Sequence, residues 1–384
     1  MIRIVTRREA APLRENLLRA AAALAALLAA AAIMALLRYN PVDVFGNIIA
    51  GSLGTAYRFR ETVNKAIPLL VLSLGTAIAF RMKFWNIGQE GQFYLGAFGA
   101  SLIAFSFPNL SAGLLLPLMF ITGLVFGGLW ALIPALLKAK FSTSETLVTL
   151  MLNYVAAKWI SFLQYGPWKD PAGNGFPKIA AFSKNAVLPG VFGIHIGWII
   201  ALLLAVFMHI LLKRTKLGYE IDVLGESEAT ARYVGISVFR VMVIAIMISG
   251  GLCGITGMMQ ASAVERSLSD QLSGGLGFTS VITAWLARLN PLTIVGAAFL
   301  FSILIQGGNF LQSSLQIPAS ISQVLQGIII FFVLGSEFFI RYRFVWTKRG
   351  GVFGYPGPLC QPPGREDEGL QAGALLLQCE GGAV

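Results

Sequence analysis

Between two hydrophobic runs, the stretch FRMKFWNIGQEGQFYLGAF, residues 80–98, gathers amide and charged side chains. Such groups could hydrogen-bond a polar solute at a gate, or they could close a turn in which Glu90 pairs with Arg81 or Lys83. Asn86 is also placed to cap a helix that begins directly after it, because its side-chain oxygen can accept from a free backbone N–H. The members of this stretch that we take as candidates for a solute path are Asn86, Gln89 and Glu90.

A second polar pattern begins at Ser142 in the stretch FSTSETLVTLMLNYVAAKWI. Glu145 follows three residues later, which predicts a capping box at the start of a helix. Thr146, Thr149 and Asn153 then recur at spacings of three and four, which place them on one helical face. In a membrane helix such a face meets protein or water rather than lipid. Asn153 is therefore either a path residue or a hydrogen-bonding contact between helices.

The later hydrophobic runs carry uncharged amide and hydroxyl side chains. Neutral donors and acceptors suit a polar, uncharged solute better than an ion, although such side chains also join helices to one another. The cysteines are not accompanied by histidines at ligand spacing, so neither a disulfide framework nor a metal site is indicated. The path candidates on these runs are Gln260, Thr279, Gln306, Asn309, Gln323 and Gln326.

The composition is typical of an integral membrane protein. Hydrophobic residues make up 56% of the 384 residues and charged residues only 12%, whereas soluble domains are about a quarter charged. Runs of about 20 apolar residues span a bilayer core of about 30 Å, and helices satisfy their own backbone groups there. The net charge of +11 lies in short segments between the runs, and it therefore predicts topology rather than nucleic-acid binding.

The runs predict an all-α polytopic protein with about ten transmembrane helices. The second and eighth runs are short of a full crossing, so we expect broken or re-entrant helices there. Glycines spaced four apart, at Gly123 and Gly127 and at Gly250 and Gly254, predict close helix approach. The predicted spans are Leu17–Leu37, Ala66–Phe80, Ile87–Phe105, Ala112–Leu137, Glu145–Gln164, Ile194–Leu212, Val241–Gln260, Leu276–Leu289, Leu292–Leu311 and Ala319–Ile340.

Charge and composition divide the chain further. Most of the 29 Lys and Arg residues fall on one side of the membrane if the first run leaves the cytoplasm, which predicts that both termini are cytoplasmic. Residues 1–347 form the predicted transmembrane domain, and the Gly- and Pro-rich residues 348–384 form a predicted disordered tail. A long outer loop, Tyr165–Gly193, is expected to be an ordered lid or docking surface.

The inner loop, residues 213–240, reads KRTKLGYEIDVLGESEATARYVGISVFR and is longer than a connection needs. Its stretch ESEATARYV favours a helix, and Gly235 is placed to end that helix as its C-cap. A short helix that projects from a membrane domain suits a site at which another protein pushes on it. The alternative is an ordinary solvated connector.

The sequence LGESEATARYVGIS resembles the coupling loop of permease subunits of ABC importers in the branched-chain amino acid and simple-sugar permease family. Three other stretches, FWNIGQEGQFYLGAF, SETLVTLMLNYVA and WLARLNPLTIVGAAFLF, are similar to the nucleoside and simple-sugar branch of that family. The family pattern commonly has a proline shortly after the glycine, where this chain has Glu226 and Ser227. The residues that match the ATPase-coupling loop are Gly225, Glu228, Ala229, Ala231, Tyr233, Gly235 and Ile236.

This resemblance implies a transport subunit, not an enzyme, in a bacterial or archaeal cell membrane. It implies three protein partners: a cytoplasmic ATPase subunit, a second permease subunit and an extracytoplasmic substrate-binding protein. A nucleoside or simple sugar is the implied substrate. The chain has no GxxxxGKS or GxxxxGKT phosphate loop, so ATP would bind the ATPase subunit and no cofactor is expected on this chain. A branched-chain amino acid permease and a secondary transporter are the alternatives.

Overall fold

The computed structural model describes residues 2–6, 12–171, 177–314, 316, 324, 327–328, 331–332, 335 and 342–346. Two compact units divide the chain, one of Met1–Arg8 with Arg341–Val384 and one of Glu9–Ile340. In the first unit, strand β1 (Ile2–Thr6) pairs antiparallel with strand β4 (Tyr342–Trp346). The predicted disordered tail, residues 348–384, lies outside the described residues.

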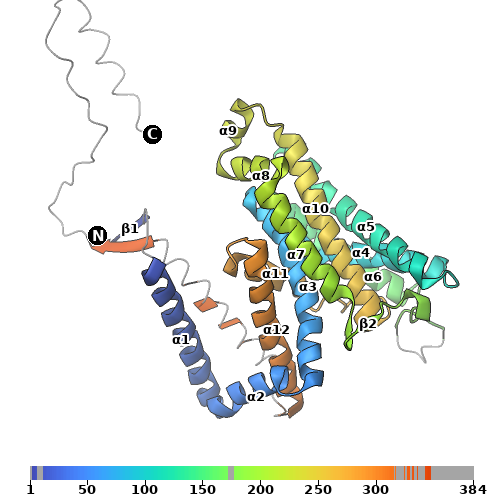
Figure 1. The fold of residues 1–384 in the computed structure, drawn as a ribbon, viewed down its shortest axis with the longest axis horizontal. Helices are drawn as coiled ribbons and strands as arrows, with labels where there is room; N and C mark the ends of the chain where they lie inside the picture. Colours follow the sequence, from blue (N-terminus) through green and yellow to red (C-terminus); the bar gives the residue numbers. More distant parts are fainter. Residues whose placement is uncertain are drawn as a thin grey trace, which may run out of the picture. The chain divides into compact units, whose positions relative to one another are not determined.

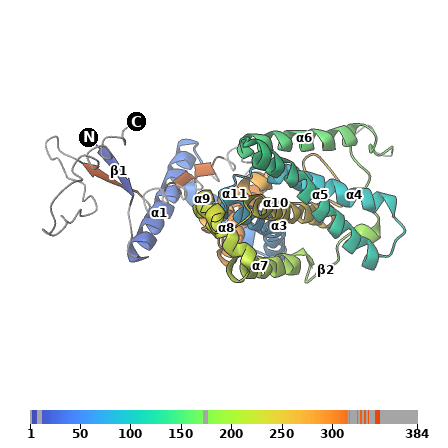
Figure 2. The same ribbon diagram turned by 90° about the horizontal axis from the view of Figure 1, so that it is seen from above.

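The second unit is a group of helices, drawn in Figures 1 and 2. In both views α5 and α10 run side by side, and α8 and α9 lie together at one end of α7 and α10. A hairpin of β2 (Gly190–Val191) and β3 (Ile194–His195) precedes α7 at its other end. The helices are α1 (Pro12–Leu36), α2 (Pro41–Leu53), α3 (Ala56–Arg81), α4 (Gln89–Ser106), α5 (Ala112–Phe141), α6 (Glu145–Tyr165), the 3-10 helix η1 (Lys184–Ala186), α7 (Gly197–Arg214), α8 (Lys216–Glu226), α9 (Glu228–Tyr233), α10 (Val238–Met259), the π-helix η2 (Gln260–Glu265), α11 (Leu276–Leu286) and α12 (Pro291–Ser314).

Six helices of the described chain are long and apolar enough to cross a membrane: α3, α5, α6, α7, α10 continued by η2, and α12. A seventh crossing results if Leu24–Leu36 and Pro41–Leu53, which are bent by 116° to each other, count as one span. The short eighth run is confirmed, because α11 has only 11 residues. The predicted count of ten spans is not confirmed, and the last predicted span, Ala319–Ile340, lies mostly outside the described residues.

The prediction of a short second span is wrong. Helix α3 has 26 residues and begins well before the apolar run that starts at Ala66. Its first turns carry charged residues that favour helix, and Thr55 caps it by accepting from Arg58 N at 3.2 Å. Hydropathy measures the length of the apolar part only, so it misses polar turns that continue the same helix.

A close crossing of α4, α5 and α10 forms the centre of the helix group. Gly254 of α10 has no room for a Cβ, because that atom would fall on the carbonyl oxygen of Gly123 in α5. Gly127 and Gly250 face each other in the same way, and Gly96 of α4 also packs against Gly254. The predicted glycine contact is therefore confirmed, since these backbones approach where no side chain separates them.

The predicted capping box at the start of α6 is wrong. Ser142 ends α5 in the left-handed conformation with φ 52°, and the N-cap of α6 is Ser144, whose side chain makes no capping hydrogen bond. Glu145 pairs instead with Lys138 of α5, with Oε2 and Nζ 2.9 Å apart. The Glu145 carboxylate thus forms a charge-assisted bond with a lysine of the neighbouring helix, instead of the predicted capping bond at the start of α6.

The described part of the outer loop is packed against α4 and against the segment after η2. Trp168 stacks on Phe98 of α4 with ring centroids 5.4 Å apart. Phe182 N donates to Arg266 O at 2.8 Å, which ties the loop to the chain that follows η2. An ordered loop therefore agrees with the prediction, whereas its role as a docking surface stays a prediction.

Candidate functional site

The polar stretch at the start of α4 is buried. Asn86 and Gln89 are inaccessible to solvent, and Glu90 is 5% exposed. We call these residues, together with the side chains that hydrogen-bond around them, the polar cluster. Its members are Thr76, Asn86, Gln89, Glu90, Gln92, Asn153, Ser249 and Ser280.

Asn86 and Gln92 form a reciprocal amide pair within the polar cluster. Asn86 Nδ2 donates to Gln92 Oε1 at 3.1 Å, and Gln92 Nε2 donates to Asn86 Oδ1 at 3.0 Å. Gly88, which is the N-cap of α4, donates its N–H to Asn86 Oδ1 at 3.0 Å. Asn86 also donates to Ser249 Oγ, which in turn donates to Gly75 O. The predicted cap at Asn86 is therefore a turn residue that joins α3, α4 and α10.

Gln89 and Glu90 connect α4 to the short helix α11. Gln89 Nε2 donates to Thr76 Oγ1 at 2.7 Å, and Ser280 Oγ of α11 donates to Gln89 Oε1 at 3.3 Å. Gly277 N donates to Glu90 Oε1 at 3.2 Å. Gly277 lies in the first turn of α11, and the helix dipole favours a carboxylate at this N-terminal end. Glu90 Oε2 is buried and has no hydrogen-bond partner within the described part of the chain. The polar cluster thus leaves one acceptor unused.

Asn153 joins α6 to the turn before α4. Its Oδ1 accepts from Gly91 N at 2.8 Å, and its Nδ2 donates to Ile87 O at 2.8 Å. Thr149 lies one turn earlier, and its Oγ1 accepts from Ile87 N at 3.3 Å. These contacts favour the alternative in which this face hydrogen-bonds to neighbouring helices, with each contact contributing about 1 kcal/mol. A path role for Asn153 stays a prediction.

Two further path candidates lie near the ends of η2 and α11. Gln260 is buried and begins the π-helix η2, and single π-helical turns are frequent at functional sites. Thr279 is half-buried, and its Oγ1 donates to Gly275 O at 3.2 Å. Thr279 is the residue before Ser280 of the polar cluster, but its hydroxyl bonds within its own chain segment and, among the described residues, does not join the cluster.

The candidates of the last runs are not brought to the polar cluster by any contact in the described chain. Gln306 is half-buried and Asn309 is exposed on α12. Between them, Gly307 packs against Ile48 of α2 without room for a Cβ, so this part of α12 faces α2. The remaining candidates, Gln323 and Gln326, lie outside the described residues.

The inner loop forms two helices, α8 and α9, which we call the arm. Helix α9 lies within the stretch predicted to be helical, and Ser227 caps it by accepting from Thr230 N at 3.3 Å. Gly235 follows with φ +80° and donates its N–H to Arg232 O at 3.1 Å. The C-cap of α9 is thus Val234, one residue before the predicted Gly235, and Gly235 follows it in the left-handed conformation.

The residues of α9 that match the coupling loop divide between an inner and an outer face. Ala231 is fully buried, whereas Ala229 is exposed and Tyr233 is 94% exposed. Glu228 pairs with Arg232 one turn later, with Oε1 and Nη2 2.7 Å apart. Helix α9 thus packs inward through a small side chain and presents an aromatic side chain outward.

Helix α8 was not predicted. Its contacts involve Gly225 and Lys83 and explain why a glycine and a lysine stand at these positions. Gly225 lies in its last turn, where a Cβ would fall on the carbonyl oxygen of Arg81 at the end of α3. Lys83 Nζ donates to Glu226 O at 3.3 Å. The interpretation in which Glu90 pairs with Arg81 or Lys83 is therefore wrong, because both cations bind α8 and the carboxylate turns toward α11.

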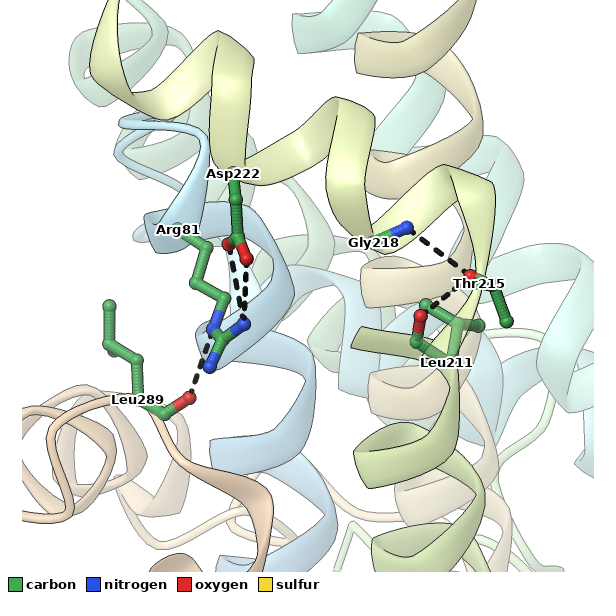
Figure 3. A network of polar contacts seen from close by, with 6 residues as sticks. All are labelled: Arg81, Leu211, Thr215, Gly218, Asp222 and Leu289. Atoms are coloured by element: carbon green, nitrogen blue, oxygen red, sulfur yellow. Dashed lines mark hydrogen bonds and ion pairs between the residues drawn. The ribbon is translucent and has the colours of Figure 1, made fainter. Parts of the chain in front are cut away.

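Figure 3 shows the polar contacts that join the arm to its neighbours. Arg81 Nη1 lies 3.3 Å from Asp222 Oδ1 of α8, and Arg81 Nε donates to Leu289 O, after α11, at 3.3 Å. At the start of α8, Thr215 Oγ1 accepts from Gly218 N at 3.2 Å and caps the helix. Arg81 is thus the point at which α3, α8 and the end of α11 meet.

A cleft of about 510 Å³ lies beside α9. Glu228 and Arg232 of α9 line it on one side. Lys138 and Ser142, from the end of α5, line it on another, and Met242 comes from α10. Side chains from three helices, charged and hydroxyl groups among them, thus line this recess.

Thr76, Ser249 and Asp222 are absent from the predicted candidates. Hydroxyl groups in helices commonly bond to the preceding turn of their own helix, so their position in the sequence does not reveal which ones reach across. Asp222 alternates with Glu220 in the stretch YEIDVLG of the inner loop, and the pattern does not say which of the two carboxylates reaches another helix.

These features define the class of protein: a polytopic, mainly helical membrane protein with a buried polar cluster and an arm of two helices at one end. Residues 59–334 match the family model described as "Branched-chain amino acid transport system / permease component". The chain belongs to this permease family.

Three curated relatives are permeases of ABC transporters. A glucose ABC transporter permease of Haloferax volcanii is 31% identical over 342 residues, which cover 85% of this chain and 90% of that protein. A nucleoside ABC transporter permease of Lactococcus lactis is 31% identical and covers 79% of this chain and 86% of its own length. A guanosine ABC transporter permease of Bacillus subtilis is 30% identical, and the match covers 85% of this chain and 94% of that protein. The predicted family and its nucleoside and simple-sugar branch are confirmed.

Proposed function

We propose that this chain is the membrane permease subunit of an ABC importer that moves nucleosides or simple sugars into the cytoplasm. The observation that carries the proposal is the arm, in which Tyr233 is 94% exposed while α8 is attached to α3. The three relatives, which are named as glucose, nucleoside and guanosine permeases, support the substrate class. The chain acts as a transport component and not as an enzyme.

In this proposal the arm docks into a cytoplasmic ATPase subunit. Lys213, Arg214 and Lys216 lie where α7 meets α8, which favours the cytoplasmic side under the positive-inside rule. Tyr233 supplies an aromatic anchor of the kind that dominates protein interfaces. Closure of the ATPase subunits would move the arm, and the helix group would alternate between inward and outward access. A second permease subunit, identical or related, and an extracytoplasmic substrate-binding protein complete the importer.

The polar cluster supports an uncharged substrate better than an amino acid. A zwitterion calls for partners of both charges at its site, whereas the side chains of the cluster are amides, hydroxyls and the single carboxylate of Glu90, which already occupies the N-terminal end of α11. We infer that Glu90, with one unused oxygen, is the member that meets a substrate hydroxyl. Uptake by Glu90→Gln and Gln89→Ala at unchanged affinity would refute a path role for this stretch.

Two variants of the arm test the ATPase-coupling assignment. Gly235→Pro cannot adopt φ +80° and loses its N–H bond to Arg232, and deletion of residues 229–233 removes most of α9. We expect both variants to insert into the membrane but to abolish uptake and stimulated ATP hydrolysis. Normal copurification with the ATPase subunit and normal stimulation in the deletion variant would sink the assignment.

A milder pair of variants separates docking from folding. Tyr233→Ala should weaken binding of the ATPase subunit by about 2 kcal/mol, as expected for an aromatic anchor, because this exposed side chain can contribute little within the chain. Tyr219→Ala is the matched control, since Tyr219 lies on α8 of the same arm and is 63% exposed. Equal binding by the two variants would argue against Tyr233 as the anchor.

The substrate is identified most directly through the substrate-binding protein. Thermal shift of that protein against nucleosides, pentoses, hexoses and branched-chain amino acids should single out a nucleoside or simple sugar, and uptake by the assembled importer should show the same preference. Stabilisation by amino acids alone would replace the proposed substrate class. Uptake that persists without ATP but stops with an uncoupler would favour a secondary transporter.

A further inference from the structure

We propose that Arg81 transmits movement of the arm to the C-terminal end of α11 and, through α11, to the polar cluster. The proposal rests on the proposed function, because it assumes that an ATPase subunit moves the arm. Arg81 is a positioning residue in this scheme, since its described contacts are with α8 and with the turn after α11.

On the arm side, charge and close packing hold α8 to the end of α3. Arg81 Nη1 lies 3.3 and 3.5 Å from the two carboxylate oxygens of Asp222. Gly225, nearly one turn later, lies against the Arg81 carbonyl without room for a Cβ. Lys83 adds a bond to Glu226 O at 3.3 Å. A displacement of α8 therefore acts directly on the end of α3.

On the other side, Arg81 holds the turn that follows α11. Its Nε donates to Leu289 O at 3.3 Å, and Leu289 has φ 55°, which residues with a side chain rarely adopt. Trp285 of α11 stacks on Trp85 with ring centroids 5.9 Å apart, and Phe80 packs against both rings. Polar and aromatic contacts together thus attach the C-terminal end of α11 to α3 and to the turn between α3 and α4.

The beginning of α11 lies in the polar cluster. Its Gly277 and Ser280 donate to Glu90 and Gln89, and Ser73 Oγ of α3 donates to Ser280 O at 3.1 Å. Helix α11 has 11 residues, a length of about 16 Å at the rise of an α-helix. One short rigid element therefore connects the residues next to the arm with the carboxylate of the polar cluster.

The chemistry of Arg81 suits this task. A guanidinium can bind a carboxylate through one N–H and a carbonyl through another at the same time, which a lysine ammonium does with less defined geometry. The side chain of Arg81 is 17% exposed and that of Asp222 is 53% exposed. Water can reach the pair from the side of Asp222, so the contact can open and re-form as the arm moves.

The test compares Arg81→Ala, Asp222→Ala and the double variant in the full transporter, reconstituted with its ATPase subunits and substrate-binding protein. The measured quantities are solute transported per ATP hydrolysed and the basal ATPase rate. We expect Arg81→Ala to assemble, to keep its basal rate and to lower the transport ratio about tenfold, within the range of coupling between distant sites. Asp222→Ala should lower it less, because the contact with Leu289 remains.

The double variant separates one shared path from two independent effects. Residues that act through one contact are not additive, so the double variant should match Arg81→Ala alone. A wild-type ratio for Arg81→Ala, or independent losses that multiply in the double variant, would overturn the proposal. If Arg81→Ala does not assemble, Asp222→Ala decides, and a wild-type ratio for it is then the overturning result.

Lys216→Ala is the matched control for loss of an ion pair on the arm. Lys216 pairs with Glu220 within α8 at 3.6 Å and is 89% exposed, and we expect a wild-type ratio for this variant. A failure of the proposed function would be recognised separately. In that case Tyr233→Ala and the deletion of residues 229–233 would leave the association with the ATPase subunit unchanged. Normal behaviour of Arg81→Ala with a defective α9 deletion refutes the inference on Arg81 alone.

Discussion

The crossing of α4, α5 and α10 and the junction between the arm and α3 both depend on glycine, but in different surroundings. In the crossing, Gly254 meets the carbonyl of Gly123, and both glycines are buried, as is Met258 beside them. In the junction, Gly225 meets the carbonyl of Arg81, while neighbouring Asp222 is exposed on the same helix. The same kind of backbone contact therefore occurs once within the core and once at its edge.

The difference indicates which part of the protein is rigid and which part can move. A contact enclosed by close-packed side chains cannot separate without leaving a void. Every atom that lines the void then loses its dispersion contacts, which costs free energy. A contact at the edge can separate more easily, because water solvates the groups that are released. The crossing is thus suited to hold the helices as one body, and the junction is suited to receive movement from a partner.

The largest expected effect comes from Gly254→Ala in the crossing. The new Cβ would meet the carbonyl oxygen of Gly123 and the Cα of Gly127, so we expect a loss of about 3 kcal/mol in stability, at the upper end for overpacking. Thermal unfolding of the purified protein in detergent measures it. Gly296→Ala on α12 is the control, because its Cβ would have no neighbour within 4 Å. Equal melting temperatures for the two variants would contradict a rigid crossing.

A smaller effect on stability is expected from Gly225→Ala, the same chemical change at the junction. The Cβ would meet the Arg81 carbonyl, but α8 can shift outward, so the loss in stability should be about 1 kcal/mol, at the lower end for overpacking. Uptake should nevertheless fall about tenfold, because the arm and α3 separate. Thermal unfolding and uptake by one preparation check both parts. A stability loss as large as that of Gly254→Ala would remove the contrast between the two regions.

The smallest effect is expected from Glu228→Gln at the tip of the arm. Glu228 and Arg232 form an ion pair at 2.7 Å with side chains 57% and 69% exposed, and exposed pairs of this spacing contribute about 0.3–0.5 kcal/mol. We expect no change in the melting temperature of the membrane protein and a loss in salt-dependent ATPase binding no larger than this. A much larger loss of binding would mean that the Glu228 carboxylate itself contacts the ATPase subunit.

Several elements of the fold follow from local sequence. Glycine spacing predicted the approach of α5 and α10, because small residues four apart share one helical face. The pattern ESEATARYVG predicted a short helix that closes within one residue of its observed C-cap, Val234, since both the N-cap and the left-handed Gly235 act within a few residues. The low apolar length of the eighth run predicted a short α11. In each case the deciding interactions lie close together in the chain.

Other predictions failed where a distant partner decided the outcome. Glu145 was assigned to a helix cap, but Lys138 of the preceding helix takes it. One of the two interpretations of Glu90 paired it with nearby cations, but Gly277, 187 residues away, donates to it. The cations of that turn bind α8 instead. Spacing identifies which groups need partners, and it does not say which partner comes near.

The sequence by itself determined that this chain is a helical membrane protein of the permease family, with polar groups that need burial or a solute and a loop that forms a helix. Caps and glycine spacing act over one or two turns, and hydropathy acts over one continuous run, so all three can be read locally. The tertiary structure alone decided that Arg81 joins Asp222 to Leu289, and that α11 lies between this junction and Glu90. The reason is physical: a buried polar group takes whichever donor or acceptor the packed helices bring within about 3 Å, and that choice depends on residues far apart in the chain.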